Sequence, residues 1–181
     1  MILSDSELVE MLREPRTRRE GFAVLVKQYS EKLYWKVRRI VLSHEDANDV
    51  LQNVFIKVWS NLQNFQGKSS LSTWLYRIAI NESLDFLRKQ KLADTVSADE
   101  DVSVASRLMS DEYFDGDEVQ ARLQEAVARL PEVQRTVFNL KYFEEMKYSE
   151  MSQILNTSEG ALKASYHLAV KKITEYLHLF D

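Results

Sequence analysis

Apolar residues recur at helical spacing along most of this chain, most clearly between residues 47 and 62. The apolar positions of this segment are Ala47, Val50, Leu51, Val54, Phe55, Val58, Trp59 and Leu62. They share one face of a helix with about 3.6 residues per turn. Only four glycines and two prolines interrupt the 181 residues, and no segment sustains the alternation of a β-strand. The sequence therefore predicts an all-α protein.

The net charge of −4 conceals three segments of different character. Residues 1–91 carry 15 basic and 11 acidic side chains, residues 92–118 carry one and nine, and residues 119–181 carry eight of each. The middle segment lacks an apolar stripe, and its net charge of −8 makes it self-repelling and extended. We predict two small helical domains, 1–91 and 119–181, joined by an acidic flexible linker at 92–118. A short helix at 102–114 is compatible with the sequence.

The residue inventory excludes several kinds of site. The chain has no cysteine, which rules out disulfides, thiol catalysis and thiolate metal sites. One Glu-x-x-His pair, Glu175 with His178, falls short of a helical dimetal centre, and there is no glycine-rich phosphate loop or nucleophile elbow. The N-terminus lacks a signal-peptide pattern, and no stretch approaches the roughly 18 apolar residues of a membrane span. We expect a cytoplasmic protein without enzyme activity, metal or cofactor.

The stretch FQGKSSLSTWLYRIAINESLDFLR, residues 65–88, joins a polar loop to a largely apolar helix. Along this helix a polar strip recurs at offsets of four, four and seven, and it consists of Thr73, Arg77, Asn81 and Arg88. Cations can bind phosphate, an amide can read a base edge, and an aromatic wall can receive an unstacked base. The strip therefore suits nucleic acid. Burial of Trp74 in the core is the more common alternative for a tryptophan at helical spacing.

Two further predicted helices of the first domain carry polar faces whose role the sequence leaves open. Opposite the apolar stripe of 47–62 lies an acidic and amide face with Asp46, Asp49, Gln52 and Asn53. It could be solvated or could bind a partner, and periodicity does not decide between them. The segment 22–41 places Lys32, Lys36, Arg38 and Arg39 largely off its apolar stripe, which we interpret as a solvated face.

The second domain has the pattern of a helix-turn-helix. Pro131 fits the first turn of one helix, and Ser149 is expected to cap the next. After the polar turn Asn156-Thr157-Ser158, a last helix presents Lys163, His167 and Lys171 at offsets of four. DNA binding is one interpretation. A generic helical hairpin is the other, because a domain without net charge is a poor general phosphate binder.

Together these pieces resemble a known family. EDANDVLQNVFIKVWSNLQNF followed by SSLSTWLYRIAINESLDFLR resembles regions 2.2 to 2.4 of bacterial sigma factors of the extracytoplasmic-function (ECF) group. The segment LQEAVARLPEVQRTVFNLKYFEEMKYSEMSQILNTSEGALKASYHLAVKKI is similar to their region 4. The resemblance covers about 20–90 and 119–175, in the same order. It implies a promoter-specificity subunit of bacterial RNA polymerase that has no active site of its own.

The resemblance also implies site residues and partners. Core RNA polymerase would be bound by Asp46, Asp49, Gln52, Asn53, Phe55 and Trp59. The single-stranded minus-ten element, with one base flipped into a pocket at the loop, would be held by Lys68, Ser69, Ser70, Ser72, Thr73, Trp74, Arg77, Asn81 and Arg88. The duplex minus-thirty-five element would be read by Ser158, Glu159, Lys163, Ser165, His167 and Lys171. An anti-sigma factor is an expected partner, and the linker would thread toward the RNA channel of the polymerase.

Two departures from the family pattern qualify these expectations. Primary sigma factors have two adjacent aromatic residues where this chain has Trp74 and Leu75, which implies weaker and more promoter-selective melting. In the last helix, Ser165, Leu168 and Val170 occupy positions that are frequently basic, which implies that upstream contacts are few or that they favour DNA shape over base edges. The alternative functions are a free-standing helix-turn-helix regulator and a helical adaptor that binds only proteins.

Overall fold

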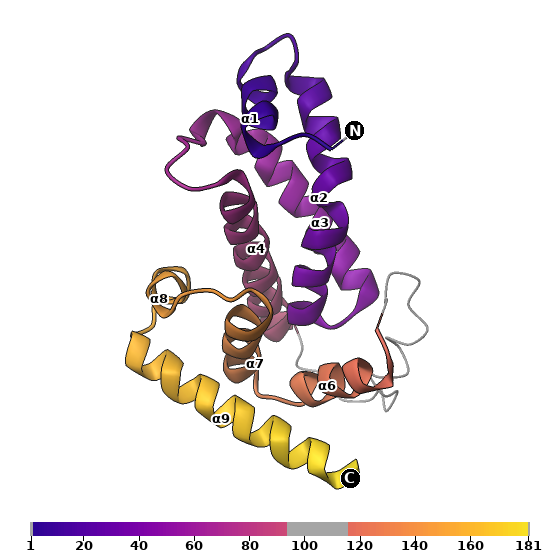
Figure 1. Ribbon diagram of the computed structural model, residues 1–181, viewed down its shortest axis with the longest axis vertical. Coiled ribbons are helices and arrows are strands. Elements are labelled where there is room, and N and C mark those ends of the chain that lie inside the picture. The colour runs from indigo at the N-terminus through magenta and orange to yellow at the C-terminus, as the bar shows by residue number, and fades with distance from the viewer. Residues whose placement is uncertain (1, 94–115, 181) are drawn as a thin grey trace. The chain divides into compact units, whose positions relative to one another are not determined.

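The computed structural model describes residues 2–93 and 116–180, and within these ranges every regular element is helical (Figure 1). The chain divides into two compact units, Met1–Thr95 and Val96–Asp181. The predicted all-α fold with two helical domains is therefore confirmed. Most of the predicted linker at 92–118, including the segment 102–114, lies outside the described residues. The proposed bounds 1–91, 92–118 and 119–181 stay predictions from charge, which limited proteolysis can test.

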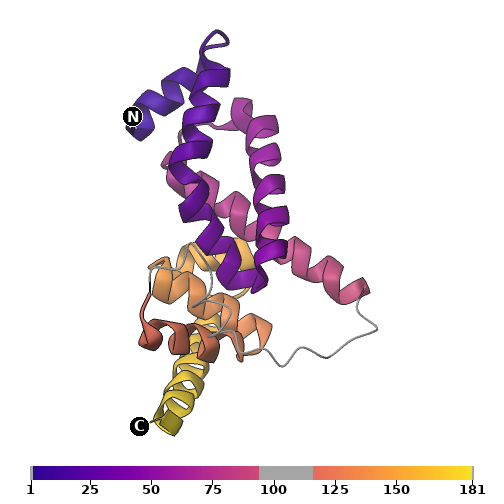
Figure 2. The same ribbon diagram turned by 90° about the vertical axis from the view of Figure 1, so that its right-hand side faces the viewer.

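The first unit is a bundle built around three long helices. Its elements are α1 (Asp5–Arg13), α2 (Arg18–Val41), α3 (His44–Asn61), the 3-10 turn η1 (Leu62–Asn64) and α4 (Leu71–Ala93). Helices α2 and α3 run side by side, and α4 packs against both of them (Figures 1 and 2). The almost fully buried side chains of this core include Leu8, Leu25, Leu33, Val37, Ile40, Val50, Val54, Leu71, Leu75 and Ile80.

Local signals fix where the first helices begin. The Ser4 hydroxyl accepts a hydrogen bond from the Glu7 amide (3.3 Å), and the Glu7 carboxylate accepts one from the Ser4 amide (2.8 Å), which completes a capping box. Ser43 caps α3 by accepting from the Asp46 amide at 3.4 Å. Such caps contribute about 1 kcal/mol each.

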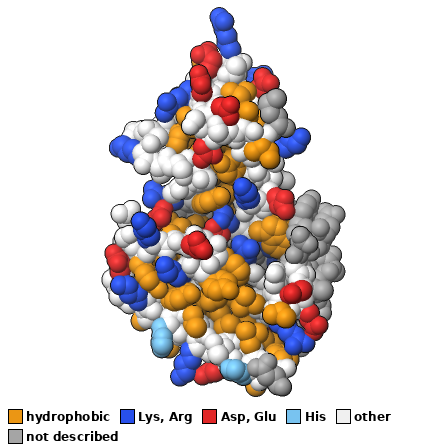
Figure 3. Space-filling view, viewed as in Figure 1, with side chains coloured by type: hydrophobic (Ala, Val, Ile, Leu, Met, Phe, Trp, Pro, Cys, Tyr) orange, Lys and Arg blue, Asp and Glu red, His pale blue; other side chains and the backbone are white. Residues whose placement is uncertain are grey.

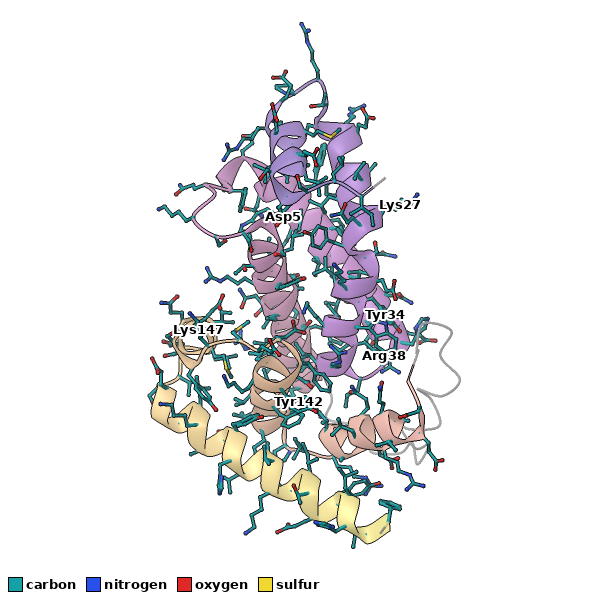
Figure 4. All side chains as sticks on the ribbon, viewed as in Figure 1. Asp5, Lys27, Tyr34, Arg38, Tyr142 and Lys147 are labelled. Carbon is teal, nitrogen blue, oxygen red and sulfur yellow. The ribbon has the colours of Figure 1, made fainter. Side chains whose placement is uncertain are left out.

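Close packing and one polar contact join the helices of this unit. A Cβ at Gly21 of α2 would come within 2.8 Å of the Met11 Cβ, so α1 can approach α2 this closely only because residue 21 is glycine. At the other end of α2, the Tyr34 hydroxyl lies 2.7 Å from Nδ1 of His44, which ties α2 to the start of α3. Figure 4 shows Tyr34 and Arg38 together in this C-terminal part of α2.

The second unit is a smaller helical domain. Its elements are α6 (Glu118–Ala128), α7 (Glu132–Phe138), the π-helical turn η2 (Asn139–Phe143), α8 (Tyr148–Leu155), α9 (Glu159–Leu177) and the 3-10 turn η3 (His178–Phe180). Its core cluster consists of Ala126, Val127, Leu130, Phe138, Ala169 and Ile173. Asn156 adopts a left-handed conformation (φ 49°) and ends α8, so that α8 and α9 are joined by a short turn.

Two predicted helix starts in this unit are wrong by one or two residues. Pro131 is the N-cap of α7 and does not belong to its first turn. Helix α8 begins at Tyr148, so Ser149 lies inside the helix and Lys147 holds the cap position without a side-chain hydrogen bond. The amides of Glu150 and Met151 donate hydrogen bonds to the Lys147 carbonyl. The helix therefore begins earlier than we predicted from the position of Ser149.

Candidate nucleic-acid interface

Hydroxyl groups gather where the loop 65–70 enters α4. The Ser70 hydroxyl accepts from the Thr73 amide (3.1 Å), donates to the Thr73 hydroxyl (2.8 Å) and lies 3.1 Å from the Ser72 hydroxyl. The loop turns at Gly67, whose φ of 71° favours glycine, and Lys68 is exposed at its tip. The sequence-predicted hydroxyls therefore lie together at the N-terminus of α4, beside a cation. Donors and acceptors of this kind suit the sugars and phosphates of a nucleic acid.

Trp74 lies at the edge of this cluster of hydroxyl side chains. Its ring lies 5.1 Å from the ring of Phe65, at an interplanar angle of 50°, and both side chains are half-buried. Trp74 is thus not enclosed in the core of the unit, which was the alternative interpretation of its sequence position. Phe65 was not predicted as a site residue. The one indication in the sequence is that it lies in the loop before the helix, nine residues before Trp74.

The α4 strip, defined as Thr73, Arg77, Asn81 and Arg88, follows the outward side of the helix. Asn81 and Arg88 are exposed, while Thr73 and Arg77 are half-buried. Arg88 donates to Asp85 at 2.8 Å in an exposed ion pair that contributes at most about 1 kcal/mol. Its guanidinium can therefore exchange this partner for a phosphate at little cost.

A hollow of about 1080 Å³ opens between α1 and the loop. One wall is formed by Phe65, Gly67, Ser69 and Ser70, and the other by Asp5, Glu10, Met11 and Glu14. Asp5, at the start of α1, is labelled in Figure 4. The α1 wall was missed from the sequence, where α1 shows only a capping signal and an apolar stripe. Carboxylate oxygens in this wall suit the amino groups of a base, and Arg13 of the same wall adds a cation beside Gly67.

The exposed side of α3 is the second predicted surface. Asp49, Gln52 and Trp59 lie along it, and Ile56, 63% exposed, lies between them at helical spacing. We call these four residues the α3 face. The ring of Trp59 is supported by Phe22 of α2 at 5.0 Å, and Phe55 lies behind it, with its ring 6.4 Å from that of Phe22. Ile56 was missed, although a large aliphatic residue off the buried stripe was visible in the sequence.

The other predicted residues of α3 lie to one side of this face. Asn53 is exposed, and Asp46 is half-buried near the C-terminal part of α4. Burial and the neighbouring charge of Asp49 raise the pKa of Asp46 above its usual value, while hydrogen bonds with Ser43 and with Gln90 of α4 oppose this. On the same flank, Lys57 of α3 forms an ion pair with Glu82 of α4. Asp46 and Lys57 therefore make contacts within the unit, while Asn53 is exposed beside the α3 face.

The predicted residues of the second unit lie on and beside α9. Lys163, His167 and Lys171 are exposed and define the α9 face, and Glu159 is exposed at the start of the helix. Ser165 is half-buried. Ser158 is the N-cap, and its hydroxyl accepts from the Ala161 amide at 3.2 Å. Its first role is therefore structural.

Additional side chains accompany the α9 face. The amino groups of Lys141 and Lys163 lie 4.8 Å and 5.6 Å from the ring centroid of Tyr148, so two cations meet one ring at the start of α8. Tyr142, 52% exposed, stacks on Phe138 at 5.0 Å. Figure 3 shows hydrophobic side chains gathered over α7 and the neighbouring part of α9, and Figure 4 labels Tyr142 and Lys147.

Within 2–93 and 116–180, no three His, Asp or Glu side chains come together as a metal site would require. In the same ranges no helix is both long and apolar enough to span a membrane.

Comparisons with known proteins show the family of this chain. Sigma-70 region 2 matches residues 25–93, and sigma-70 region 4 matches residues 120–173. The ECF RNA polymerase sigma factor SigW of Bacillus subtilis is 32% identical over 157 residues, which cover 82% of this chain and 84% of SigW. The RNA polymerase sigma-H factor of Pseudomonas aeruginosa is 30% identical over 182 residues, which cover 96% and 93% of the two chains.

Two solved structures share the fold. The sigma factor RpoE of Bartonella quintana, in complex with the anti-sigma factor NepR, matches with a TM-score of 0.70 and 20% identity over 88% of this chain and 98% of its own. CnrH, in complex with the cytosolic domain of CnrY, matches with a TM-score of 0.63 and 20% identity over 98% and 96%. With both family regions present in order and relatives matched over most of their length, this chain belongs to the ECF group of bacterial RNA polymerase sigma factors.

Proposed function

We propose that this sigma factor has three binding surfaces, each for a different partner or DNA element. Sigma factors bind core RNA polymerase and direct promoter recognition, so each surface serves a macromolecular partner. The α3 face, with Phe55, Asp46 and Asn53 beside it, binds core polymerase. The loop 65–70 and the α4 strip hold the opened minus-ten element. The α9 face, with Glu159 and Ser165, reads the minus-thirty-five duplex. The chain catalyses no reaction itself and acts in the cytoplasm.

The observation that carries this proposal is the assembly at the N-terminus of α4. Hydroxyls, an exposed cation and the Phe65–Trp74 ring pair lie within one loop and one helix turn, and a hollow of about 1080 Å³ opens between this loop and α1. A base leaving a duplex loses stacking worth a few kcal/mol, which binding in a pocket can return. The hollow supplies such a pocket, and the α4 strip supplies cations and an amide for the strand that leads to it.

An anti-sigma factor is part of the proposal. The two solved structures described above are complexes in which a second protein binds the chain that shares this fold. On this chain, exposed apolar side chains remain on each unit, among them Ile56 and Trp59 on the first and Val133 and Tyr142 on the second. Apolar surface of this kind is typical of protein partners. A protein that covers the α3 face would compete directly with polymerase.

Reconstitution with core polymerase tests the function. The purified chain should comigrate with core RNA polymerase in gel filtration, and the mixture should give discrete run-off transcripts on genomic fragments that core polymerase alone does not give. DNA binding without polymerase binding would identify a free-standing regulator. Polymerase binding without new transcripts would identify an adaptor. The match of residues 25–93 to sigma-70 region 2 favours the sigma factor over both.

A further inference from the structure

A row of apolar side chains lies on the exposed side of α9. Ala161, Ala164 and Leu168 recur at offsets of three and four, so they share one stripe of the helix. All three are exposed, Leu168 to 46%. We call these three residues the α9 apolar stripe. None of them belongs to the buried residues of α9, so the core of the second unit does not explain the stripe.

Gly160 continues the exposed side of α9 into the first turn of the helix. It is itself exposed and lies four residues before Ala164. Leaving aside its chain neighbours and the backbone of its own helix turn, a Cβ at this position would meet no described atom within 4 Å. Packing inside the unit therefore does not require a glycine here, although glycine is among the least favourable residues in a helix. A partner that closely approaches the start of α9 would explain this residue.

The α9 face of Lys163, His167 and Lys171 runs beside the α9 apolar stripe. Leu168 lies three residues before Lys171, and residues at this spacing are neighbours on a helix surface. A cationic row beside an apolar row suits a DNA duplex, because phosphates line the major groove and the C5-methyl group of thymine projects into it. A protein partner fits less well, because lysine and alanine are both depleted in the centres of protein interfaces.

We propose that the α9 apolar stripe reads thymines of the minus-thirty-five element through their C5-methyl groups, and that Gly160 lets the start of α9 lie deep in the major groove. The inference rests on the proposed function of the α9 face. Residues 161–168 span about 10 Å of helix, which corresponds to roughly three base pairs at 3.4 Å each.

The position of the stripe along α9 supports this assignment. In a helix-turn-helix, the N-terminal part of the second helix is the part that contacts base edges, and the stripe with Gly160 occupies that half of α9. Alanine and other apolar side chains are known partners of the thymine methyl group. The stripe therefore reads sequence by hydrocarbon contact, while the cations of the α9 face bind the backbone.

The test compares thymine with uracil, which lacks the C5-methyl group. Holoenzyme formed from the full chain and core polymerase is titrated with a labelled fragment of a promoter found by run-off, in which thymines of the minus-thirty-five element are replaced by uracil one at a time. A preformed bubble at the minus-ten element keeps promoter opening from limiting the measurement. Leu168→Ala shortens the stripe. Val170→Ala is the matched control, because Val170 is 38% exposed on the same helix and lies about 200° around the axis from Leu168.

We expect uracil at one or more positions to weaken binding of the unmodified chain and of Val170→Ala about 4-fold, as the loss of one buried methyl group would. Leu168→Ala should bind the thymine fragment about 4-fold or more weakly. At the base that Leu168 contacts, this variant should no longer distinguish thymine from uracil. Its slope of log K against log salt should equal that of the unmodified chain, because no phosphate contact is lost.

Three results would overturn the proposal. One is a lack of any uracil effect on the unmodified chain, and another is a uracil effect that persists in full in Leu168→Ala. The third is weaker binding of Leu168→Ala to core polymerase with normal binding to DNA, since the stripe would then contact a protein.

Two further variants separate DNA contact from folding. Leu168→Met keeps a hydrocarbon side chain of similar volume, so it should retain the uracil effect. Gly160→Ala should raise the melting temperature, because alanine is the better helix former, and should weaken binding to the promoter fragment several-fold. A higher melting temperature with unchanged affinity would overturn the close approach of DNA to Gly160.

Lys163→Ala with Lys171→Ala reports on the proposed function. If this pair weakens binding to the promoter fragment while the uracil effect persists in Leu168→Ala, only the inference about the stripe fails. If neither the lysine pair nor uracil changes the affinity, the minus-thirty-five assignment of α9 fails with it.

Discussion

The two surfaces that we propose for nucleic acid, α4 with its loop and the α9 face, are built differently. The first lies in the basic half of the chain and combines hydroxyls, an aromatic pair and a hollow. The second is a row of exposed side chains on one helix in a domain whose basic and acidic residues balance. A duplex presents base edges in a groove that a protruding helix can read. An extruded base needs walls on both sides, so the first surface must be concave and the second convex.

This difference predicts that the first surface carries more of the free energy of promoter opening. Arg77→Ala with Asn81→Ala should reduce opening of a duplex promoter by about 100-fold or more, because the returned stacking energy is a few kcal/mol. Permanganate reactivity of unpaired thymines measures opening. A template with a preformed bubble at the minus-ten element should restore transcription in part.

The control for this pair is Lys89→Ala, an exposed cation of α4 outside the α4 strip. Gel filtration with core polymerase and thermal melting confirm that the double variant folds and assembles. Normal thymine reactivity in a folded double variant would mean that another part of the chain melts the promoter. The predicted difference between the two surfaces would then be wrong.

The next effect concerns the α3 face, which we propose binds core polymerase. Asp49→Lys with Gln52→Lys should weaken binding to core polymerase about 10- to 100-fold, because it reverses the charge of this face. Exposed substitutions usually change stability within about 0.5 kcal/mol, so the melting temperature should hardly move. Ser60→Lys, which adds a charge to the exposed end of the same helix, is the control. Equal polymerase affinity of both variants would return the α3 face to a solvated role.

The α9 face should give a smaller effect, limited to upstream DNA. Lys163→Ala with Lys171→Ala should lower affinity for a minus-thirty-five duplex about 10-fold and reduce the salt slope by about 2, since each duplex phosphate contributes about 0.9. Lys172→Ala tests whether any exposed cation of α9 has the same effect. Opening of a promoter with a preformed bubble should not change. If it does change, the two surfaces are not independent.

Sequence reasoning succeeded where the determinants are local. The helix at 47–62, the capping box of Ser4 and the cap of Ser43 depend on residues within four positions of each other, and the structure has all three. The stepwise polar strip on α4 likewise follows from its spacing alone.

It failed where partners come from another helix. The α1 wall of the hollow depends on Gly21 allowing α1 to approach α2. Lys36 was interpreted as solvated because the sequence does not show that Tyr76 of α4 lies against it. The predicted cap at Ser149 was wrong for a related reason. Tyr148 is the first residue of α8, and its ring contacts Lys141 and Lys163, which lie outside α8 and far from Ser149 in the sequence.

The smallest predicted effect separates folding from recognition at Ser158, which belongs to both the α9 helix and the predicted minus-thirty-five site. Its hydroxyl caps α9, so Ser158→Ala should lower the free energy of unfolding of the second unit by about 1 kcal/mol. Ser158→Asp keeps an acceptor for the Ala161 amide and should be nearly neutral or stabilising, because negative charge suits a helix N-terminus. For affinity to duplex DNA we expect the opposite order of the two variants. The added carboxylate of the Asp variant would repel phosphate and weaken duplex binding several-fold, whereas the Ala variant should bind nearly normally below its melting temperature. Thermal melting and duplex titration of both variants measure the two orders. Weaker binding by Ala together with normal binding by Asp would mean that the cap is the whole role of Ser158, and that the convex surface begins further along α9.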